Sequence, residues 1–511
     1  MNQQQTIKAG STGTVIMYLA VFAGIILRFA APDLKPFSPQ EASFAGMLAG
    51  KNFLEALFTS VAVSPQPPLF NILTWIVTSI LGISEFSMRL LPAMFGTAAI
   101  FVVQKMTRSF YSERVSILAV SLFSLNPFLI SISRSCSFAS LFLLISLLMV
   151  YYFMLSVKYN SFVMGPFIFW SIAAIYTHHN ALLLLAVLNA VLFLRYREEI
   201  RINLWIRSQI YILLSWLPLC VYLFKGISAG VYPWENPSML PLFFYREMLL
   251  GPVLGFNIVT IMFLLAVSFF LLVGIVTLRS IKEKRMTDIM TIIAAMLPVI
   301  PWIEEIIRKQ PYGPQVMALS GALILILIAV GASHLSRDGT VLFSVITVVF
   351  YAWAAFVYFY QPAGAADVRK AYTEVSSQYR DRDIVFNTDP ENYIPFQFYN
   401  AHMNGKNIPD ILLAPVPEFK GNKTIRKMWR VIKNFLLEKT GTDVYAGYDR
   451  NIIPEDMIEN EIAGASRVWL LCSAGDTGAE TDKPWVKRHF REVSRKTSGG
   501  INIILLEKTY K

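Results

Sequence analysis

The sequence predicts a polytopic α-helical membrane protein that ends in a small soluble α/β domain. Hydrophobic residues make up 55% of the 511 residues, charged residues make up 15%, and the mean hydropathy is +0.50. The apolar segments are concentrated in residues 1–360, whereas residues 361–511 have a mixed composition. Together these observations exclude an ordinary soluble enzyme, a disordered chain and a collagen-like fibre.

About 20 consecutive apolar residues are needed to cross a bilayer as a helix. The first apolar segment is too long for a cleaved signal peptide and lacks a small-residue cleavage site, so we expect a membrane anchor there. Eleven spans are predicted, near residues 13–31, 89–105, 115–132, 138–156, 161–178, 180–195, 208–224, 256–278, 289–303, 316–333 and 340–360.

Residues 69–83 decide the predicted topology, because a crossing there would move every later loop to the other side. The segment is apolar but has only 15 residues and follows Pro67-Pro68. If it does not cross, the loops on the side of the N-terminus hold fourteen Lys and Arg residues and the opposite connections hold eight. Basic residues collect on the cytoplasmic side. We therefore expect a re-entrant or interfacial helix at 69–83, a cytoplasmic N-terminus and an extracytoplasmic C-terminal domain.

From about residue 361 the pattern is that of a soluble α/β domain. Residues 383–387, 467–472 and 501–507 are predicted to be buried strands. A helix is predicted to open at Asp482-Lys483-Pro484, to continue to about Lys496, and to be closed by Gly499-Gly500. The predicted domains are 1–360, with a large outer loop at 32–88 and a second at 225–255, and 361–511.

The net charge of +11 belongs mostly to the apolar part, where residues 1–360 carry 23 Lys and Arg against 14 Asp and Glu. Basic residues in such a segment are typical of cytoplasmic loops, so we expect membrane lipid as a partner and no nucleic acid. Cys136, Cys220 and Cys472 lie far apart and form no CxxC pair. They predict neither a zinc site nor a disulfide framework.

The predicted topology brings unusual polar residues to the outer membrane face. An ionisable residue held near the bilayer is costly, which favours a functional role. Polar residues also collect at span ends simply because water begins there, so both interpretations stay open for each position. The candidates are Glu41, Gln66, Arg89, Arg134, His178, His179 and Tyr312, with Trp234 and Glu235 as residues that border an acceptor cleft or belong to the interface.

These residue types suit one kind of chemistry. A carboxylate such as Glu41 can act as a general base toward an acceptor hydroxyl. Arginines such as Arg89 and Arg134 can bind a lipid-linked phosphate and stabilise it as a leaving group. The N-terminus of the helix that follows Pro67-Pro68 can present backbone N–H groups to the same anion. The set is compatible with a sugar transferase that uses a polyprenyl-phosphate donor.

The order of these residues resembles that of the C-type, multi-span glycosyltransferases, namely glycosyltransferase family 39 with its protein O-mannosyltransferases and the bacterial lipid A sugar transferases. The resemblance covers residues 10–200 and, faintly, 300–360. It implies the C-type fold and transfer of a hexose or pentose from a polyprenyl-phosphate donor to a glycan, lipid or protein acceptor on the extracytoplasmic side of the membrane. The matching stretches are QEASFAGMLAG (40–50), QPPLFNILTWIV (66–77), LGISEFSMRLLPAMFG (81–96), SLNPFLISISRSCSF (124–138) and IYTHHNALLLL (175–185).

The first loop departs from the pattern of that family, in which the first acid of a pair is the expected base. Gln40 takes that position here and Glu41 keeps the second acid. Either Glu41 is the base, with Gln40 as a hydrogen-bond partner of a sugar hydroxyl, or the chain is an inactive relative. Other departures are Gln66 in place of His or Lys, Cys136 in place of Arg, and Pro311-Tyr312 in place of Arg-Tyr.

Three functions therefore remain in competition. The first is a membrane glycosyltransferase, expected in a bacterial inner membrane. The second is a catalytically inactive relative that serves as a lipid-binding or assembly scaffold, which Gln40 favours. The third is a transporter or flippase, which is disfavoured because spans 180–195 and 316–333 carry no acid or base in their middles and no inverted halves with broken helices are visible. Some members of the resembling family use a divalent metal, but no His and Glu spacing specifies one here.

Overall fold

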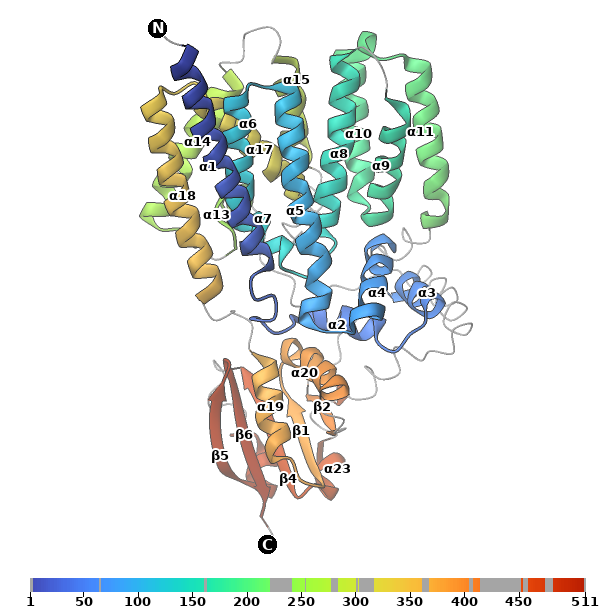
Figure 1. Ribbon diagram of the computed structural model, residues 1–511. Coiled ribbons are helices and arrows are strands. Elements are labelled where there is room, and N and C mark those ends of the chain that lie inside the picture. Colours follow the sequence, from blue (N-terminus) through green and yellow to red (C-terminus); the bar gives the residue numbers. More distant parts are fainter. Residues whose placement is uncertain are drawn as a thin grey trace. The chain divides into compact units, whose positions relative to one another are not determined.

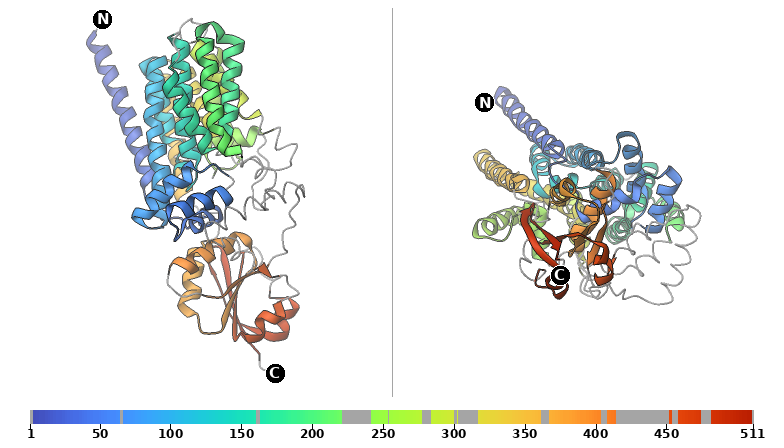
Figure 2. Two further views of the ribbon diagram at one scale, coloured as in Figure 1. Left: turned by 90° about the vertical axis from the view of Figure 1, so that its right-hand side faces the viewer. Right: turned by 90° about the horizontal axis from the view of Figure 1, so that it is seen from below.

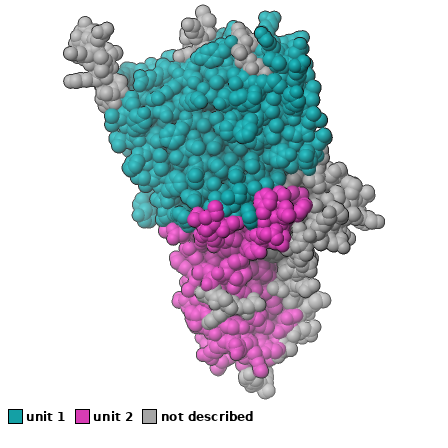
Figure 3. Space-filling model, turned by 45° about the vertical axis from the view of Figure 1, so that its right-hand side comes forward, with its two compact units in different colours: residues 1–32, 64–77, 86–360 teal, residues 33–63, 78–85, 361–511 magenta. Residues whose placement is uncertain are grey.

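The chain forms two compact units, which Figure 3 colours separately. Unit 1 comprises Met1–Pro32, Ser64–Val77 and Phe86–Tyr360, and unit 2 comprises Asp33–Val63, Thr78–Glu85 and Gln361–Lys511. The computed structural model describes residues 3–63, 66–159, 163–220, 241–252, 254–276, 284–299, 302, 317–360, 367–403, 408–413, 452–453, 458–473 and 481–509. Most of the predicted outer loop 32–88 thus packs with the C-terminal segment, although the sequence-based division assigns it to the membrane domain.

Unit 1 is a bundle of apolar helices that run side by side (Figure 1). Each of the eleven predicted spans overlaps a helix, and the predicted dipping segment 69–83 forms α4 (Leu69–Leu81). The other helices are α1 (Gln3–Phe29), α5 (Glu85–Phe110), α6 (Glu113–Leu125), α7 (Pro127–Ser133), α8 (Ala139–Lys158), α9 (Met164–Thr177), α10 (Asn180–Val191), α11 (Ile202–Trp216), α13 (Pro241–Leu250), α14 (Ile258–Val276), α15 (Lys284–Met296), α17 (Ala318–Ala332) and α18 (Arg337–Tyr360).

Four of the described helices are long and apolar enough to cross a membrane by themselves, namely α5, α8, α14 and α18. The pair α6 and α7 is a fifth if its bend of 54° lies within one span. The other predicted spans coincide with shorter helices, so the number eleven stays a prediction.

The bend between α6 and α7 has a local cause at Asn126-Pro127. Pro127 has no N–H to continue the helix, and Asn126 Oδ1 instead accepts the Leu129 N–H at 3.0 Å, which caps α7. The Asn126 Nδ2 group donates to the carbonyl of Met248 at the end of α13 and to the Tyr351 hydroxyl of α18. One buried amide therefore joins three segments of the bundle at the bend.

Unit 2 contains a six-stranded sheet with the strand order β3-β2-β1-β4-β6-β5. Strands β1 to β4 pair in parallel, whereas β6 pairs antiparallel with both β4 and β5. The predicted strands are confirmed as β1, β4 and β6. The bounds are β1 (Asp383–Asn387), β2 (Asp410–Leu413), β3 (Ile452–Ile453), β4 (Arg467–Ser473), β5 (Phe490–Ser498) and β6 (Ile501–Lys508).

Helices cover both faces of this sheet (Figure 2). One face packs against α19 (Val368–Gln378) and α20 (Pro390–His402). The other face carries an apolar core in which Phe386, Val468 and Leu506 pack against Trp485 of α24 (Pro484–His489) and Ile458 of α23 (Ile458–Glu461). The first loop adds α2 (Pro39–Leu48) and α3 (Phe53–Val63) to this unit, and α2 packs against α20.

The helix predicted from Asp482 to about Lys496 is wrong beyond His489, where β5 begins. Gly499 and Gly500 have φ of +59° and +81°, so they form the two-residue turn of a β-hairpin rather than a helix stop. Ser498 and Ile501 are paired directly across this turn. The strand is exposed along most of its length, so its polar sequence resembles a surface helix and pairing with β6 decides its conformation.

A buried ion pair joins the first residues of β1 and β4. The fully buried carboxylate of Asp383 accepts hydrogen bonds from Arg467 Nε at 2.9 Å and Nη2 at 2.5 Å, and from Trp469 Nε1 at 3.0 Å. Arg467 also donates to the carbonyl of Gln378 at the end of α19. A buried charge is tolerated only when it is paired and hydrogen-bonded in this way.

Asp410 should make the stability of unit 2 depend on pH. Its Oδ1 accepts a weak hydrogen bond from Asn400 at 3.4 Å, and its Oδ2 has no partner within the described part of unit 2. Burial raises the pKa of Asp410 to about 7. The folded-state pKa of Asp410 lies above its unfolded value of about 3.9, so protonation of this carboxyl favours the folded state. This contribution to the free energy of unfolding is fully present below the unfolded pKa. The contribution is lost as the pH rises through the folded pKa.

We therefore expect unit 2 of the full chain to unfold more easily at pH 8 than at pH 5, with a difference of up to a few kcal/mol. This difference in stability is measured by heating the detergent-solubilised protein at each pH and monitoring the unfolding by limited proteolysis. Asp410→Asn should remove this part of the pH dependence, whereas Asp482→Asn, at an exposed carboxylate paired with Lys487, should keep it. An unchanged pH profile in Asp410→Asn would contradict this role.

Candidate functional site

Arg134 closes the C-terminal end of α1. Its Nη1 donates to the carbonyls of Leu27 and Ala30, and its Nη2 donates to the carbonyl of Ala31 at 3.0 Å. The last carbonyls of a helix lack partners within the helix, and the helix dipole attracts cations to them. The guanidinium also lies over the Phe359 ring at 4.5 Å. This predicted site residue is thus held by neutral acceptors, which orient its charge without neutralising it.

Arg89 is brought to the same place. It is 5% exposed and donates from Nη1 to the carbonyl of Pro32 at 2.6 Å, three residues after the end of α1. Burial is the main cause that lowers the pKa of Arg134; Tyr358 raises this pKa and the like charge of Arg89 lowers it further. The two arginines predicted from the sequence therefore lie close together.

A third arginine, Arg28, was not singled out from the sequence because it falls inside the first predicted span. It is 1% exposed, and its Nη1 donates to the carbonyls of Gly24 and Ser124, both at 2.8 Å. The Ser124 carbonyl is available because α6 ends one residue later at the Asn126-Pro127 break. Among the residues that the structure describes, its Nε and Nη2 have no hydrogen-bond partner. The signal was present in the sequence, since an arginine within an apolar span is functional by default.

Glu41 has a clear structural role at the start of α2. Ser38 is the N-cap, its Oγ accepts the Glu41 N–H, and Glu41 Oε2 accepts the Ser38 N–H at 3.0 Å. The sequence SPQE is thus a capping box, in which two helix-end donors are satisfied reciprocally. Glu41 is 6% exposed, whereas the side chain of Gln40 is exposed.

The segment before α2 is held within unit 2 by a polar cluster. The Tyr399 hydroxyl of α20 accepts the Phe37 N–H and donates to Glu85 Oε1, both at 2.9 Å. Arg369 of α19 pairs with the same Glu85 oxygen at 3.3 Å and donates to the Asp33 carbonyl at 3.1 Å. We call Glu85, Arg369 and Tyr399 the loop clasp. Sequence analysis missed it because Glu85 lies about 300 residues before Arg369 and Tyr399 in the chain.

The remaining predicted residues lie elsewhere in the bundle. His178 ends α9, and its Nδ1 accepts the Asn180 N–H at 3.1 Å while its ring stacks on Phe138 at 4.5 Å. His179 is the next residue, with its ring 6.0 Å from that of His178. Gln66 is half-buried and precedes the buried Pro67-Pro68 at the start of α4. Tyr312, Trp234 and Glu235 lie outside the described residues.

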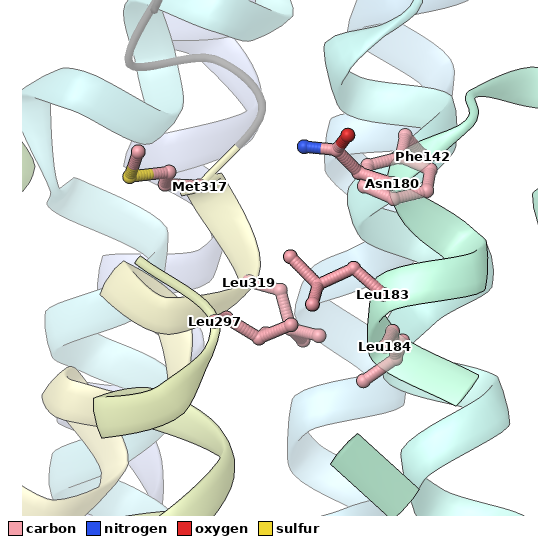
Figure 4. Close-up of a pocket in the computed structure, with 7 residues that line it drawn as sticks. All are labelled: Phe142, Asn180, Leu183, Leu184, Leu297, Met317 and Leu319. Carbon is pink, nitrogen blue, oxygen red and sulfur yellow. The ribbon is translucent and has the colours of Figure 1, made fainter. Parts of the chain in front are cut away.

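A small apolar cavity lies next to His178. The ring of His178 packs against Phe142 with a centroid distance of 5.5 Å. Phe142 lines the cavity together with Asn180, whose amide points toward Met317 (Figure 4). Leu183, Leu184, Leu297 and Leu319 complete the lining. Among the residues that the structure describes, no group of three or more His, Cys, Asp or Glu could hold a metal ion.

Comparison with known proteins identifies the fold. The family model described as dolichyl-phosphate-mannose-protein mannosyltransferase matches residues 65–223. The crystal structure of ArnT from Cupriavidus metallidurans in the apo state is similar over 97% of this chain and 98% of that chain, with a TM-score of 0.61 and 13% identity. The chain has the GT-C glycosyltransferase fold.

Two further structures share this GT-C fold. ArnT from Cupriavidus metallidurans bound to undecaprenyl phosphate matches over 96% of this chain and 97% of that chain, with a TM-score of 0.59 and 12% identity. The arabinofuranosyltransferase AftD from Mycobacteria matches over 96% of this chain and 40% of that chain, with a TM-score of 0.50 and 12% identity. A comparison with curated protein sequences finds no match.

The comparisons confirm the GT-C fold that the resemblance implied. The matched range of the family model contains Gln66, Arg89, Arg134, His178 and His179 but not Gln40 or Glu41. The roles of all these residues stay predictions.

Proposed function

We propose that this GT-C chain is a membrane glycosyltransferase that moves a sugar from a polyprenyl-phosphate-linked donor to a glycan, lipid or protein acceptor. The observation that carries the proposal is the convergence of Arg28, Arg89 and Arg134 on the last turn of α1 and the residues just after it. Within the described ranges no carboxylate pairs with Arg28 or Arg134. Their charge therefore stays available to an anion in a medium of low dielectric constant.

The arginines would act on the leaving group. In the proposed reaction an acceptor hydroxyl attacks the anomeric carbon, the bond from that carbon to the carrier phosphate breaks, and the phosphate departs with the electron pair. Arg89 and Arg134 are assigned to this phosphate, and Arg28 adds a third positive charge. Charge-assisted contacts to phosphate are among the strongest hydrogen bonds in proteins.

The proton of the acceptor hydroxyl must be removed in the same reaction. Glu41 is our candidate for this base or for an acid that orients the acceptor, and Gln40 for a hydrogen bond to a sugar hydroxyl, since an amide does not accept a proton near neutral pH. Gln66, His178, His179 and Tyr312 are assigned to substrate contacts. We place the site on the extracytoplasmic side of a bacterial inner membrane, with the N-terminus in the cytoplasm.

Two observations favour the inactive relative as a second candidate. Glu41 is engaged in the capping box, and the position of the usual first acid holds Gln40. A chain that kept the fold and lost its base would have both features and could still bind a lipid phosphate as a scaffold.

Transfer from labelled polyprenyl-phosphate hexoses and pentoses, measured in membranes that contain the wild type or Gln40→Asp, tests the proposal. We expect the wild type to release polyprenyl phosphate and to form a labelled product. Activity in Gln40→Asp alone would favour the inactive relative. Failure of both proteins with every donor would contradict a transferase.

A further inference from the structure

The loop clasp holds the two ends of the segment that carries α2. Asp33 and Phe37 lie just before α2, and Glu85 is the first residue of α5, the helix that carries Arg89. Arg369 and Tyr399 come from the C-terminal part of unit 2. They contact one end of the segment at the backbone of Asp33 and Phe37 and the other end at one oxygen of Glu85. The aromatic ring of Phe37 packs edge-on against Phe398 at 5.1 Å and lies stacked with Tyr399 at 6.4 Å.

The Tyr399 hydroxyl is the centre of the clasp, because it is both acceptor and donor. It accepts the Phe37 N–H and gives its own proton to Glu85. Burial and the adjacent Glu85 carboxylate raise the pKa of Tyr399, so the hydroxyl keeps its proton over the physiological range. A hydrogen bond from a hydroxyl to a carboxylate is stronger than one between neutral groups.

Glu41 lies only four positions after Phe37 along the chain. Phe37 precedes the N-cap Ser38, so its N–H direction sets where α2 begins. The capping box then fixes Glu41 relative to Ser38. The clasp therefore determines the position of Gln40 and Glu41 through a short and rigid stretch of backbone.

We propose that Tyr399, Glu85 and Arg369 are positioning residues for the transfer reaction, because they hold the segment that carries Gln40 and Glu41. The inference rests on the proposed function and deepens it. A shift of about 1 Å in a catalytic group is enough to lower a rate about a hundredfold. The clasp would thus act on the chemical step rather than on donor binding.

Tyr399→Phe tests the proposal, because it removes the hydroxyl and keeps the ring. We expect kcat to fall about ten- to a hundredfold, as the loss of a hydrogen bond to a charged group implies, while KM for the lipid-linked donor stays within about twofold. Hydrogen exchange at the Phe37 amide should accelerate by a similar factor, since this N–H donates to the Tyr399 hydroxyl. Glu85→Gln combined with Tyr399→Phe should be no worse than the stronger single change.

Tyr372→Phe is the matched control. Tyr372 is a fully buried tyrosine of α19 in the same unit, and its hydroxyl has no hydrogen-bond partner in the described ranges. Its removal should leave kcat and the Phe37 exchange rate unchanged.

Two results would overturn the inference. The first is wild-type kcat in Tyr399→Phe, whatever its stability. The second is an unchanged exchange rate at Phe37, which would show that the clasp does not hold this segment. If the wild type transfers no sugar at all, the proposed function fails, and the exchange experiment alone decides whether the clasp holds the start of α2.

Discussion

Replacing Glu41 by Gln should abolish sugar transfer and leave α2 intact. A Gln at this position still accepts the Ser38 N–H, because the capping box works with Glu or Gln. It cannot accept a proton from the acceptor hydroxyl near neutral pH. The loss of a general base lowers rates about 10²- to 10⁴-fold. Single-turnover transfer with a labelled donor would measure the loss, and hydrogen exchange over residues 38–48 would report on the helix.

Ser38→Ala is the complementary variant. It removes the side-chain cap, at a cost of about 0.5–2 kcal/mol, and keeps the Glu41 carboxylate. We expect faster exchange in the first turn of α2 and only a modest fall in transfer. If Glu41→Gln retains activity while Ser38→Ala loses it, Glu41 has a structural role and the base must be sought elsewhere.

Arg28→Met should weaken the binding of polyprenyl phosphate by about tenfold or more, because it removes one of three clustered charges from a site of low dielectric constant. The ligand-free protein should lose little stability. A buried charge without a paired opposite charge is costly, so its removal is itself favourable. That gain offsets the cost of about 1–3 kcal/mol for leaving the Ser124 carbonyl without its donor.

Two controls separate charge from packing at this position. Arg28→Lys keeps the charge and should keep most of the affinity. Arg195→Met removes an exposed arginine paired with Asp288 in the same unit and should change neither affinity nor stability. If Arg28→Met binds polyprenyl phosphate as tightly as the wild type and unfolds more easily, the role of Arg28 is to join α1 to α6 and not to bind the phosphate. Binding is measured as the rise in Tm that polyprenyl phosphate causes. Polyprenol, which lacks the phosphate, is the control ligand.

The sequence predicted the helices of the bundle well, because hydrophobic length is a local property of each segment. The strands at 383–387, 467–472 and 501–507 were also found, since each is a short buried apolar run. The hairpin of β5 was missed: its turn glycines were interpreted as a helix stop, and the exposed strand has no alternating pattern. Here the partner strand β6 decides the structure, and pairing is not a local property.

The candidate site was predicted less completely. Arg89 and Arg134 were found as charged residues at span ends, but the capping box was overlooked, although Ser38 and Glu41 have its spacing. Arg28 was hidden by the apolar residues around it. The loop clasp could not be predicted from one sequence, because Glu85 and Tyr399 become neighbours only through the fold of unit 2.

Photo-crosslinking with a polyprenyl phosphate that carries a photoreactive group next to its phosphate tests the central claim most directly. Mass spectrometry of the labelled wild-type protein should locate the label in peptides that contain the end of α1, near residues 27–32, or Arg89 or Arg134. Unlabelled polyprenyl phosphate should compete, and polyprenol should not. The proposed phosphate site would be contradicted if polyprenol prevented labelling as well as polyprenyl phosphate does. It would also be contradicted if the label were found only on peptides remote from these arginines.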